Sequence, residues 1–535
     1  MQRPFAGRDT GSKSQPDQIA CCPYDWVVAA LDFLAIHAGD SPVKPAVILG
    51  GRTLDFATLN QQANRAANVF KSLDCAPGDR IATMAFNSIE AFEIANGLRR
   101  AGMVVVPVNY RLRGAEIAYV LNDSGAKVVV AGPDHVDVVT SSAPDVTGDL
   151  QYVALGSRLR GGWLSYHALM ERAADKEPAG VGGDALAASM IYTSGTTGNP
   201  KGAWRPHGVS IENVMQVISL FELSQSDVHL MCGPGYHSGV AFFSALHQVL
   251  GATVVVQPRF EADDALDLIA QHGVTTTFIA PTLLQRLVDA QELRPRNVAS
   301  LRAVILGAAP CPYALKVRAE AVFGKVLWEF YGATETGVNT VLRPEDQMRK
   351  PGSCGTAVPG QEIRLVGADG EEAPDGEPGE LMVRSNWLAE YYKRPDATGK
   401  SLHDGFFSVG DVAYRDAEGY YFICDRRIDM IISGGVNIYP AEVEAALHAH
   451  PAVMDAAVIG VPDEQWGESV KAVVQLRPGA KATSDELIAF CAGRLASYKK
   501  PRSIDFVAEL PRDAAGKLLK RNIREPYWAA AGRRI

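Results

Sequence analysis

The sequence contains no apolar run as long as the roughly 18 residues that a membrane-spanning helix needs. Its start, MQRPFAGRDTGSKSQPDQ, is polar and has no apolar centre, so it does not resemble a secretory leader. The formal net charge is −9, whereas a nucleic-acid-binding protein usually carries a basic face. These absences predict a cytoplasmic protein that has no transmembrane segment and no nucleic-acid partner.

Two common site patterns are also missing. The eight cysteines are dispersed, and no pair has the C-x-x-C spacing that is typical of zinc and redox sites. Such cysteines are typical of a reducing compartment, where most are small buried side chains. The P-loop pattern G-x-x-x-x-G-K-[ST] is not met either, because its nearest segment, RPDATGKS at 394–401, begins with arginine.

Short β-branched runs alternate with helical patterns along much of the chain. AKVVVAG (126–132) and RAVILGAA (302–309) are typical of buried strands. The segment FATLNQQANRAANVFKSL places its apolar residues on one helical face, and ADDALDLIAQHG does likewise, with Gly273 as a C-cap. This alternation predicts an α/β architecture with largely buried sheets.

The residue composition and the expected element lengths change near the C-terminal third of the sequence. The segment 366–380 is rich in turn residues and predicts a β subdomain, and the elements become shorter after Asp425. We therefore predict three parts. Residues 1–24 form a flexible tail, 25–426 form a large domain of α/β layers plus the β subdomain, and 427–535 form a small mobile α+β domain.

The stretch IYTSGTTGNPKGA (191–203) combines glycines, hydroxyl residues and one lysine. Its glycines allow a loop to bend tightly and bring backbone amides near a ligand. Its Ser and Thr hydroxyls add donors, and Lys201 adds a positive charge. A loop of this kind at a strand end predicts a polyphosphate site. The alternative is a solvent-exposed turn of the same composition.

YTSGTTGNPKG (192–202) resembles the signature loop of the adenylate-forming superfamily, which includes acyl-CoA synthetases, peptide-synthetase adenylation domains and firefly-type luciferases. Four further segments resemble the family's other motifs, in the same order: YGATE (331–335), DGFFSVGD (404–411), DRRIDMIISGGVNIYPAEVE (425–444) and LPRDAAGKLLKR (510–521). The resemblance implies a large nucleotide-binding domain, a small domain that turns against it, and the use of ATP with Mg²⁺.

The resemblance also assigns nucleotide contacts. Thr334 would contact the α-phosphate, Glu335 would hold the metal, and Tyr331 would stack on adenine unless it is a packed core aromatic. Asp411 and Arg426 would contact the ribose; an Asx-turn and a surface arginine are their alternatives. The expected ATP- or AMP-binding set is Thr193, Ser194, Gly195, Thr196, Thr197, Gly198, Gly307, Ala308, Ala309, Tyr331, Gly332, Thr334, Asp411, Ile423 and Arg426.

Four residues are expected to be catalytic: Lys201, Thr334, Glu335 and Lys517. Lys517 is far from the phosphate loop in sequence, so its role requires the small domain to close; a solvated lysine is the alternative. The expected hinge is Arg427, Ile428 and Asp429, with Ile428 where the family commonly has Asp or Lys. Gly434 and Gly435 would line the pantetheine channel of coenzyme A, or form a tight turn before a helix that begins at Pro440.

The resemblance implies two steps. A substrate carboxylate attacks the α-phosphate of ATP, and a thiol then attacks the acyl-adenylate. The segment CGPGYHSGVAFF (232–243) has no Asp or Glu to pair with an ammonium group, so an α-amino acid is disfavoured. Gly332 stands where acetate-activating relatives have tryptophan. The expected acyl pocket is His237, Gly239, Val240, Gly332 and Gly337, with His237 either a gate or a wall residue.

We therefore expect an AMP-forming acid–CoA ligase that accepts an apolar acid: fatty, aromatic or ring-bearing. No carrier domain follows the last motif, so free coenzyme A is the expected acceptor. An enzyme that loads an acyl-carrier protein remains an alternative. A non-catalytic acyl- or nucleotide-binding relative is another, although the charged site residues are present. A homodimer also remains open.

Overall fold

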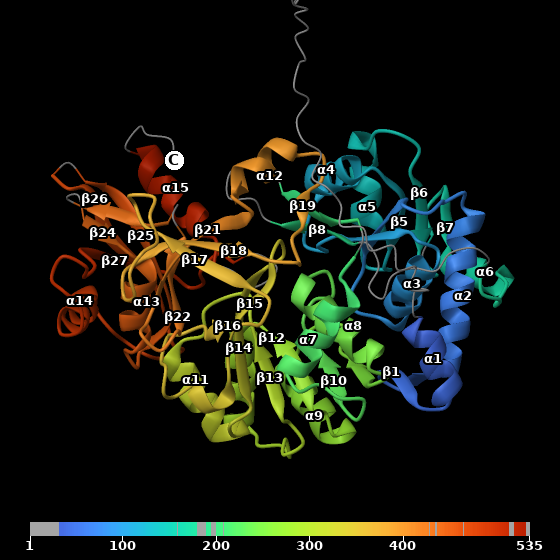
Figure 1. Ribbon diagram of the computed structural model, residues 1–535, viewed down its shortest axis with the longest axis horizontal. Helices are drawn as coiled ribbons and strands as arrows, with labels where there is room; N and C mark the ends of the chain where they lie inside the picture. The colour runs from blue at the N-terminus through green and yellow to red at the C-terminus, as the bar shows by residue number, and fades with distance from the viewer. Residues whose placement is uncertain are drawn as a thin grey trace, which may run out of the picture.

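The computed structural model describes residues 32–157, 159–178, 189–193, 200–206, 208–426, 429–433, 436–463, 465–512 and 518–530. Figure 1 shows the chain as layers of sheet and helix, with the C-terminal part at the left. The expected tail, residues 1–24, lies outside the described ranges. No helix of the described ranges has both the length and the apolar character needed to cross a bilayer.

Helices cover the sheets or lie between them. The α-helices are α1 (Phe33–Asp40), α2 (Phe56–Ser72), α3 (Ile89–Arg100), α4 (Gly114–Ser124), α5 (Val136–Ser142), α6 (Tyr166–Arg172), α7 (Ile211–Leu220), α8 (Ser238–Val249), α9 (Ala262–His272), α10 (Pro281–Leu293), α11 (Tyr313–Phe323), α12 (Pro395–Ser401), α13 (Pro440–His448), α14 (Ser484–Ala492) and α15 (Lys520–Ala530). Short 3₁₀ turns occupy Ala143–Asp145 and Pro344–Asp346. The predicted C-cap Gly273 is left-handed, with φ +60°, and ends α9 as expected.

Two large sheets form the bulk of the first domain. The first sheet has the order β16-β15-β14-β13-β12-β10-β11-β1-β2. Its strands are β16 (Thr356–Ala357), β15 (Gly337–Leu342), β14 (Leu327–Ala333), β13 (Ala303–Leu306), β12 (Thr276–Ile279), β10 (Val228–Met231), β11 (Thr253–Val256), β1 (Pro45–Leu49) and β2 (Arg52–Asp55). Its central strands are parallel and, in β11, β12 and β13, buried at every position, and β11 and β13 are accordingly nearly continuous apolar runs.

The second sheet has the order β19-β9-β8-β4-β3-β5-β6-β7. Its strands are β19 (Glu390–Tyr391), β9 (Lys201–Arg205), β8 (Ser189–Thr193), β4 (Val104–Pro107), β3 (Arg80–Met84), β5 (Ala126–Ala131), β6 (Gln151–Ala154) and β7 (Trp163–Ser165). The run from β4 to β7 is parallel, whereas β8 and β9 form an antiparallel hairpin beside it. The phosphate-loop segment connects the two strands of that hairpin.

Helices α2 and α3 pack between the two large sheets. The N-terminal halves of both helices join the core of the first sheet, through residues such as Phe56 and Ile89. Their later residues, such as Phe70 and Leu98, join the core of the second sheet. A Cβ on Gly97 of α3 would lie 2.7 Å from the Ala66 Cβ of α2, so glycine permits the close approach of these helices.

Two smaller sheets follow. The β subdomain contains β17 (Glu362–Val366), β18 (Gly379–Arg384), β20 (Leu402–His403), β21 (Phe406–Arg415) and β22 (Tyr421–Arg426). The last sheet contains β23 (Ile431–Ser433), β24 (Val436–Ile438), β25 (Val453–Asp463), β26 (Gly467–Leu476) and β27 (Ser503–Phe506), and α13 packs on β25. The predicted α/β fold with a smaller C-terminal α+β domain is confirmed. The domain limits themselves stay a prediction, although the chain passes to the last sheet between β22 and β23.

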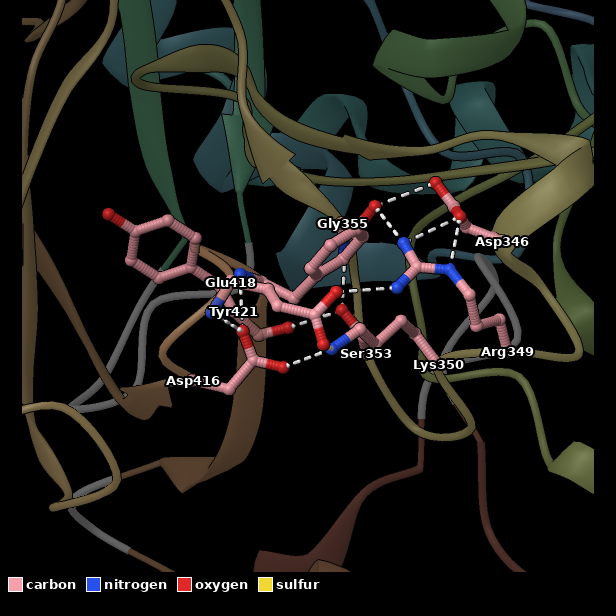
Figure 2. A network of polar contacts seen from close by, with 9 residues as sticks. Asp346, Arg349, Lys350, Ser353, Gly355, Asp416, Glu418 and Tyr421 are labelled. Carbon is pink, nitrogen blue, oxygen red and sulfur yellow. Dashed lines mark hydrogen bonds and ion pairs between the residues drawn. The ribbon is translucent and has the colours of Figure 1, made fainter.

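The β21–β22 hairpin is joined to the segment between β15 and β16 of the first large sheet by a network of charges (Figure 2). The Lys350 ammonium lies 2.7 Å from the Asp416 carboxylate and 2.6 Å from that of Glu418. Arg349 joins Glu418 at 2.6 Å and Asp346 at 2.8 Å. The network orients the hairpin that carries the expected ribose residues.

We expect Gly97→Ala to lower the free energy of unfolding by about 1–3 kcal/mol, because its methyl group would overpack the contact between α2 and α3. Its Cβ would also lie 2.8 Å from the backbone nitrogen of Ala67, which cannot move independently. Gly399→Ala in α12 is the matched control, since no heavy atom lies within 4 Å of its Cβ position. The free energy of unfolding of the Gly399→Ala control should rise by up to about 1 kcal/mol, because alanine has a higher helix propensity than glycine. Urea unfolding would measure both, and equal effects would contradict the packing explanation.

Candidate active site

The phosphate loop is anchored at both ends by the β8–β9 hairpin. Thr193 and Lys201 are opposite each other in the strand register, and the Thr193 hydroxyl oxygen lies 3.4 Å from the Lys201 carbonyl oxygen. The loop residues Ser194, Gly195, Thr196, Thr197 and Gly198 lie outside the described residues, so their expected phosphate contacts stay a prediction. The hairpin itself brings Thr193 and Lys201 together, as the motif requires.

Glu335 lies in the turn between β14 and β15 and is buried, with 6% of its surface exposed. Its Oε1 accepts hydrogen bonds from the Thr193 hydroxyl at 3.3 Å and the Tyr391 hydroxyl at 2.9 Å. The Lys201 ammonium lies 4.6 Å from the centre of the Tyr391 ring. A buried carboxylate is costly unless it is hydrogen-bonded, and these hydroxyls meet that need. Thus the expected metal residue and the flank of the phosphate loop form one cluster.

The donors around Glu335 fit Mg²⁺. Mg²⁺ prefers oxygen ligands and is usually held by one or two carboxylates together with substrate phosphates. Glu335 supplies one buried carboxylate, and Thr193, which donates to it, supplies a hydroxyl oxygen beside it. The described residues contain no group of three or more His, Cys, Asp or Glu side chains that could bind a metal ion alone. The arrangement therefore suits a metal that arrives with nucleotide phosphates, and Mg²⁺ stays a prediction.

Arg205, at the end of β9, lies beside Glu335. Its guanidinium donates to the carbonyl oxygen of Thr334 and, over 2.8 Å, to that of Trp387. Burial lowers the pKa of Arg205 to about 10, while the nearby negative charge of Glu335 opposes the shift. Arg205 thus joins the phosphate side of the site to the segment before β19. No motif pointed to it, since its partners are far away in sequence.

Thr334 faces the N-terminus of α8. Its Oγ1 lies 3.2 Å from the Oγ of Ser238, the first residue of that helix. The positive end of a helix dipole favours an anion, so this position suits the negative charge that collects on an α-phosphate. Ser238 is a second candidate that the motifs did not single out, although it lies in the segment expected to line the acyl pocket.

The expected nucleoside residues meet where β14 approaches β21. The Tyr331 hydroxyl donates to Oδ2 of Asp411 over 2.7 Å, and Asp411 is buried, at 8% exposed. Arg426 is the register partner of Asp411 on β22, but its side chain lies outside the described residues. Ile423 on β22 is half-buried and packs against the same apolar cluster as Tyr331. The fold thus brings together Tyr331, Asp411 and the backbone of Arg426, and their contacts with a nucleoside stay predictions.

The segment 307–309 follows β13 and carries backbone strain. Ala308 has φ +70°, a left-handed conformation that is uncommon for a residue with a Cβ. The loop is supported beyond it, where the Cys311 amide donates to Glu329 over 3.3 Å. Glu329 also forms a buried ion pair with Lys316 of α11. Strained residues of this kind cluster at ligand sites, which is consistent with the adenine-side role expected for Gly307, Ala308 and Ala309.

The expected acyl-pocket glycines contact aromatic rings of the protein. A Cβ on Gly239 would lie 2.5 Å from the Phe278 ring, and one on Gly337 would lie 2.8 Å from the Trp387 ring. Gly332 has a backbone reason to be glycine as well, because its Cβ would lie 2.1 Å from the Gly337 carbonyl oxygen. Val240 is buried in α8. The structure thus adds a second reason for each glycine beyond leaving room for substrate.

His237 is the N-cap residue of α8 and is half-buried. Its ring lies almost parallel to that of Phe278, at 22° and 6.4 Å between centroids. This position beside the expected acyl site is compatible with either of the roles that the sequence left open, a gate or a wall residue. Its role stays a prediction.

Several expected residues lie outside the described ranges: Lys517, Gly434, Gly435, Arg427 and Ile428. The ends of the Lys517 segment are described and are held to the C-terminal domain. Arg512 and Leu518 form an isolated β-bridge, and the Lys520 ammonium lies 3.0 Å from the Glu444 carboxylate. Asp429 of the expected hinge is half-buried. The reach of Lys517 toward the phosphate side stays a prediction.

Tyr391 was also missed by the motifs, because it is 56 residues from Glu335 in sequence. We expect Tyr391→Phe to raise about tenfold the Mg²⁺ concentration needed for half-maximal thermal stabilisation by ATP, the scale of losing a residue that orients a metal ligand. Tyr392→Phe is the matched control, since the Tyr392 ring packs against Trp204. Thermal melts at fixed ATP and varied Mg²⁺ would measure the shift. An equal response of both variants would argue against this role of Tyr391.

We expect Arg205→Met to lower the free energy of unfolding by about 2–4 kcal/mol, because two carbonyls lose a donor and Glu335 loses a compensating charge. Arg205→Lys keeps the charge but not the forked geometry, so its loss should be intermediate. Arg52→Met provides a control with a largely exposed arginine, which should change stability little. Denaturant unfolding would rank the three variants. If Arg52→Met lowered the free energy of unfolding as much as Arg205→Met, the bridging role of Arg205 would be contradicted.

Comparison with known proteins gave two family matches. The family model for AMP-binding enzymes matches residues 34–393, and the model for the C-terminal domain of AMP-binding enzymes matches residues 442–517. A feruloyl-CoA synthase of an Amycolatopsis species is 38% identical over 91% of this chain and 96% of its own length. A fatty acid–acyl-carrier-protein ligase of Streptomyces coeruleorubidus is 34% identical over 94% of this chain and 97% of its own.

Among solved structures, ATP-bound MatB from Rhodopseudomonas palustris is similar over almost its whole length. The two chains are 31% identical with a TM-score of 0.83, covering 92% of this chain and 98% of that one. The family matches include both the part that carries the phosphate hairpin and the part that carries the Lys517 segment. The chain therefore belongs to the AMP-binding enzyme family, in the acyl-CoA synthetase branch of the adenylate-forming superfamily.

Proposed function

We propose that this AMP-forming acid–CoA ligase activates an apolar carboxylic acid and transfers its acyl group to coenzyme A. The observation that carries the proposal is the junction at Thr334. On one side lies the polar cluster of Glu335, Thr193 and Lys201; on the other lie the N-terminus of α8 and a set of aromatic rings. The carboxylate of an acid bound at this junction would face the groups that are expected to bind phosphate, and the rest of the acid would face apolar side chains.

In the first step, a carboxylate oxygen of the acid attacks the α-phosphorus of ATP. The bond from this phosphorus to the bridging oxygen breaks, and pyrophosphate leaves. Lys201, Thr334 and the α8 N-terminus would stabilise the negative charge that develops on the phosphate oxygens, and the 3.2 Å contact of Thr334 with Ser238 at the start of α8 supports this role. Bound Mg²⁺ would supply further positive charge at those oxygens, held through Glu335. Positioning and electrostatics suffice, so no general base is needed.

In the second step, the thiol of coenzyme A attacks the acyl carbonyl carbon. The bond from that carbon to the phosphate oxygen breaks, AMP leaves, and the thiol proton passes to solvent. A free thiol has a pKa near ~8.5, so a weak base or water can accept its proton. We infer that the small domain turns between the steps, bringing Lys517 to the site for the first and Gly434 and Gly435 for the second.

The direct test supplies ATP, Mg²⁺ and a panel of carboxylic acids, with and without coenzyme A, and follows pyrophosphate and AMP. AMP release that requires both an apolar acid and coenzyme A supports the proposal. Exchange of pyrophosphate without turnover dependent on coenzyme A would point instead to an acyl-carrier protein as acceptor, the acceptor in the printed name of the Streptomyces coeruleorubidus relative. Silence across the panel would contradict adenylation.

We expect Lys517→Ala to slow pyrophosphate release about 10²–10³-fold, the scale of losing one charge-stabilising donor in the transition state. Thioester formation from supplied acyl-adenylate should be nearly unchanged, because the lysine is needed only for the first step. Lys481→Ala is the control, since Lys481 is an exposed lysine of the same domain. Stopped-flow or quench measurements would separate the steps. Equal slowing of both steps by Lys517→Ala would contradict the two-conformation mechanism.

A further inference from the structure

A set of apolar rings surrounds the N-terminal half of α8. We call it the aromatic wall, and it consists of Phe242, Phe243, Phe278, Phe330 and Trp387. Phe243, Phe278 and Trp387 are buried, whereas Phe242 and Phe330 are half-buried. The wall thus combines a fixed interior layer with two rings that retain accessible surface.

One side of the wall is a stack built by α8 and β12. The Phe278 and Phe243 rings are nearly parallel, at 14° with centroids 5.2 Å apart. Gly239 precedes Phe243 by one helical turn on the same face, and its missing side chain admits the edge of the Phe278 ring. The Phe330 ring contacts both, with centroids 5.9 Å from each. These contacts fix the positions of the rings through close packing.

On the other side of the wall, beside the first turn of α8, two rings are in contact and leave the wall closed. The Phe242 and Trp387 rings meet edge to face, with centroids 5.5 Å apart at 76°. That separation is direct contact for aromatic rings. Trp387 also packs on Gly337, and its carbonyl accepts a hydrogen bond from Arg205 over 2.8 Å. Trp387 is therefore fixed by its contact with Gly337 and by its hydrogen bond from Arg205, and moving it would cost free energy.

The distance from the reacting carboxylate to the aromatic wall can be estimated along helix α8. Ser238 marks the reacting end, because its hydroxyl lies 3.2 Å from that of Thr334. Phe242 is four residues further on the same face, which is about 6 Å along the axis at 1.5 Å per residue. Side chains on a helix lean toward its N-terminus, so the Phe242 ring lies closer still. An acyl group that follows α8 from Thr334 therefore meets the closed side of the wall after about the length of one ring.

We propose that the acyl site accepts a carboxylic acid with a single aromatic ring, attached directly or through a short linker, and excludes long-chain fatty acids. This proposal rests on the proposed function, since it names the substrate class of that site. A ring placed against Phe330 and His237 gains offset-stacked or edge-to-face contacts. A long alkyl chain has to separate Phe242 from Trp387 and so disrupts a packed core.

The test compares single-ring acids (benzoic, phenylacetic and hydroxycinnamic) with octanoic, dodecanoic and hexadecanoic acids by ATP–pyrophosphate exchange. For the wild-type enzyme, kcat/KM of the best single-ring acid should exceed that of dodecanoic acid by about tenfold or more, the scale of excluding groups that a site cannot hold. Preference for dodecanoic or hexadecanoic acid would overturn the proposal but leave the proposed function standing. Absence of exchange with every acid would overturn the proposed function itself.

Two variants test the wall directly. Trp387→Ala should raise kcat/KM for dodecanoic acid relative to the best single-ring acid by about tenfold, because it opens the closed side. Phe242→Leu changes a half-buried ring and should act in the same direction if Trp387→Ala fails to fold. Phe56→Leu is the control, since it removes a buried ring of the same core that packs against His37. The proposal would be overturned if the ratio of kcat/KM for dodecanoic acid to that for the best single-ring acid were the same in the wall variants as in Phe56→Leu.

Discussion

The hydrogen-bonded carboxylate of Glu335 is the constraint around which the site is organised. Glu335 belongs to the first large sheet, while its donors Thr193 and Tyr391 belong to the second. A buried charge has to be compensated locally, so these contacts hold the edges of the two sheets together. Arg205 adds a second connection of the same kind, from β9 to the carbonyl of Thr334. The groups that are expected to bind phosphate are thus assembled at a junction between sheets rather than within one loop.

The same junction separates two chemical environments. Ser238 begins α8 beside Thr334, and four residues later the helix is surrounded by the aromatic wall. Charge stabilisation and apolar packing therefore occur within about one turn of one helix. This closeness is what an acid-activating enzyme needs, because the substrate carboxylate is polar and the rest of the acid is not. The glycines of this region serve the packing of the protein's own rings as well as any substrate.

The small domain and the nucleoside side are connected through the β subdomain. Asp411 lies on β21, and the chain leaves β22 directly after Arg426 to enter the last sheet. The charge network of Lys350, Asp416 and Glu418 fastens the far end of this hairpin (Figure 2). The hairpin is the expected support against which the small domain would turn. The departure from the family pattern at Ile428 falls immediately beyond that support.

The sequence by itself determined the family and the fold class, because these depend on local patterns, and it predicted which residues are chemically active. Glycines and hydroxyls in a strand-end loop favour phosphate binding, and alternating buried strands and helices indicate α/β layers. Mg²⁺, the individual nucleotide contacts and the domain limits stay predictions. Contacts between distant segments could not be derived this way: Tyr391 and Glu335, Arg205 and Thr334, and Phe242 and Trp387 carry no shared local signal. Only the tertiary structure decided that the small residues near α8 receive aromatic rings, because a missing side chain indicates space but not what fills it.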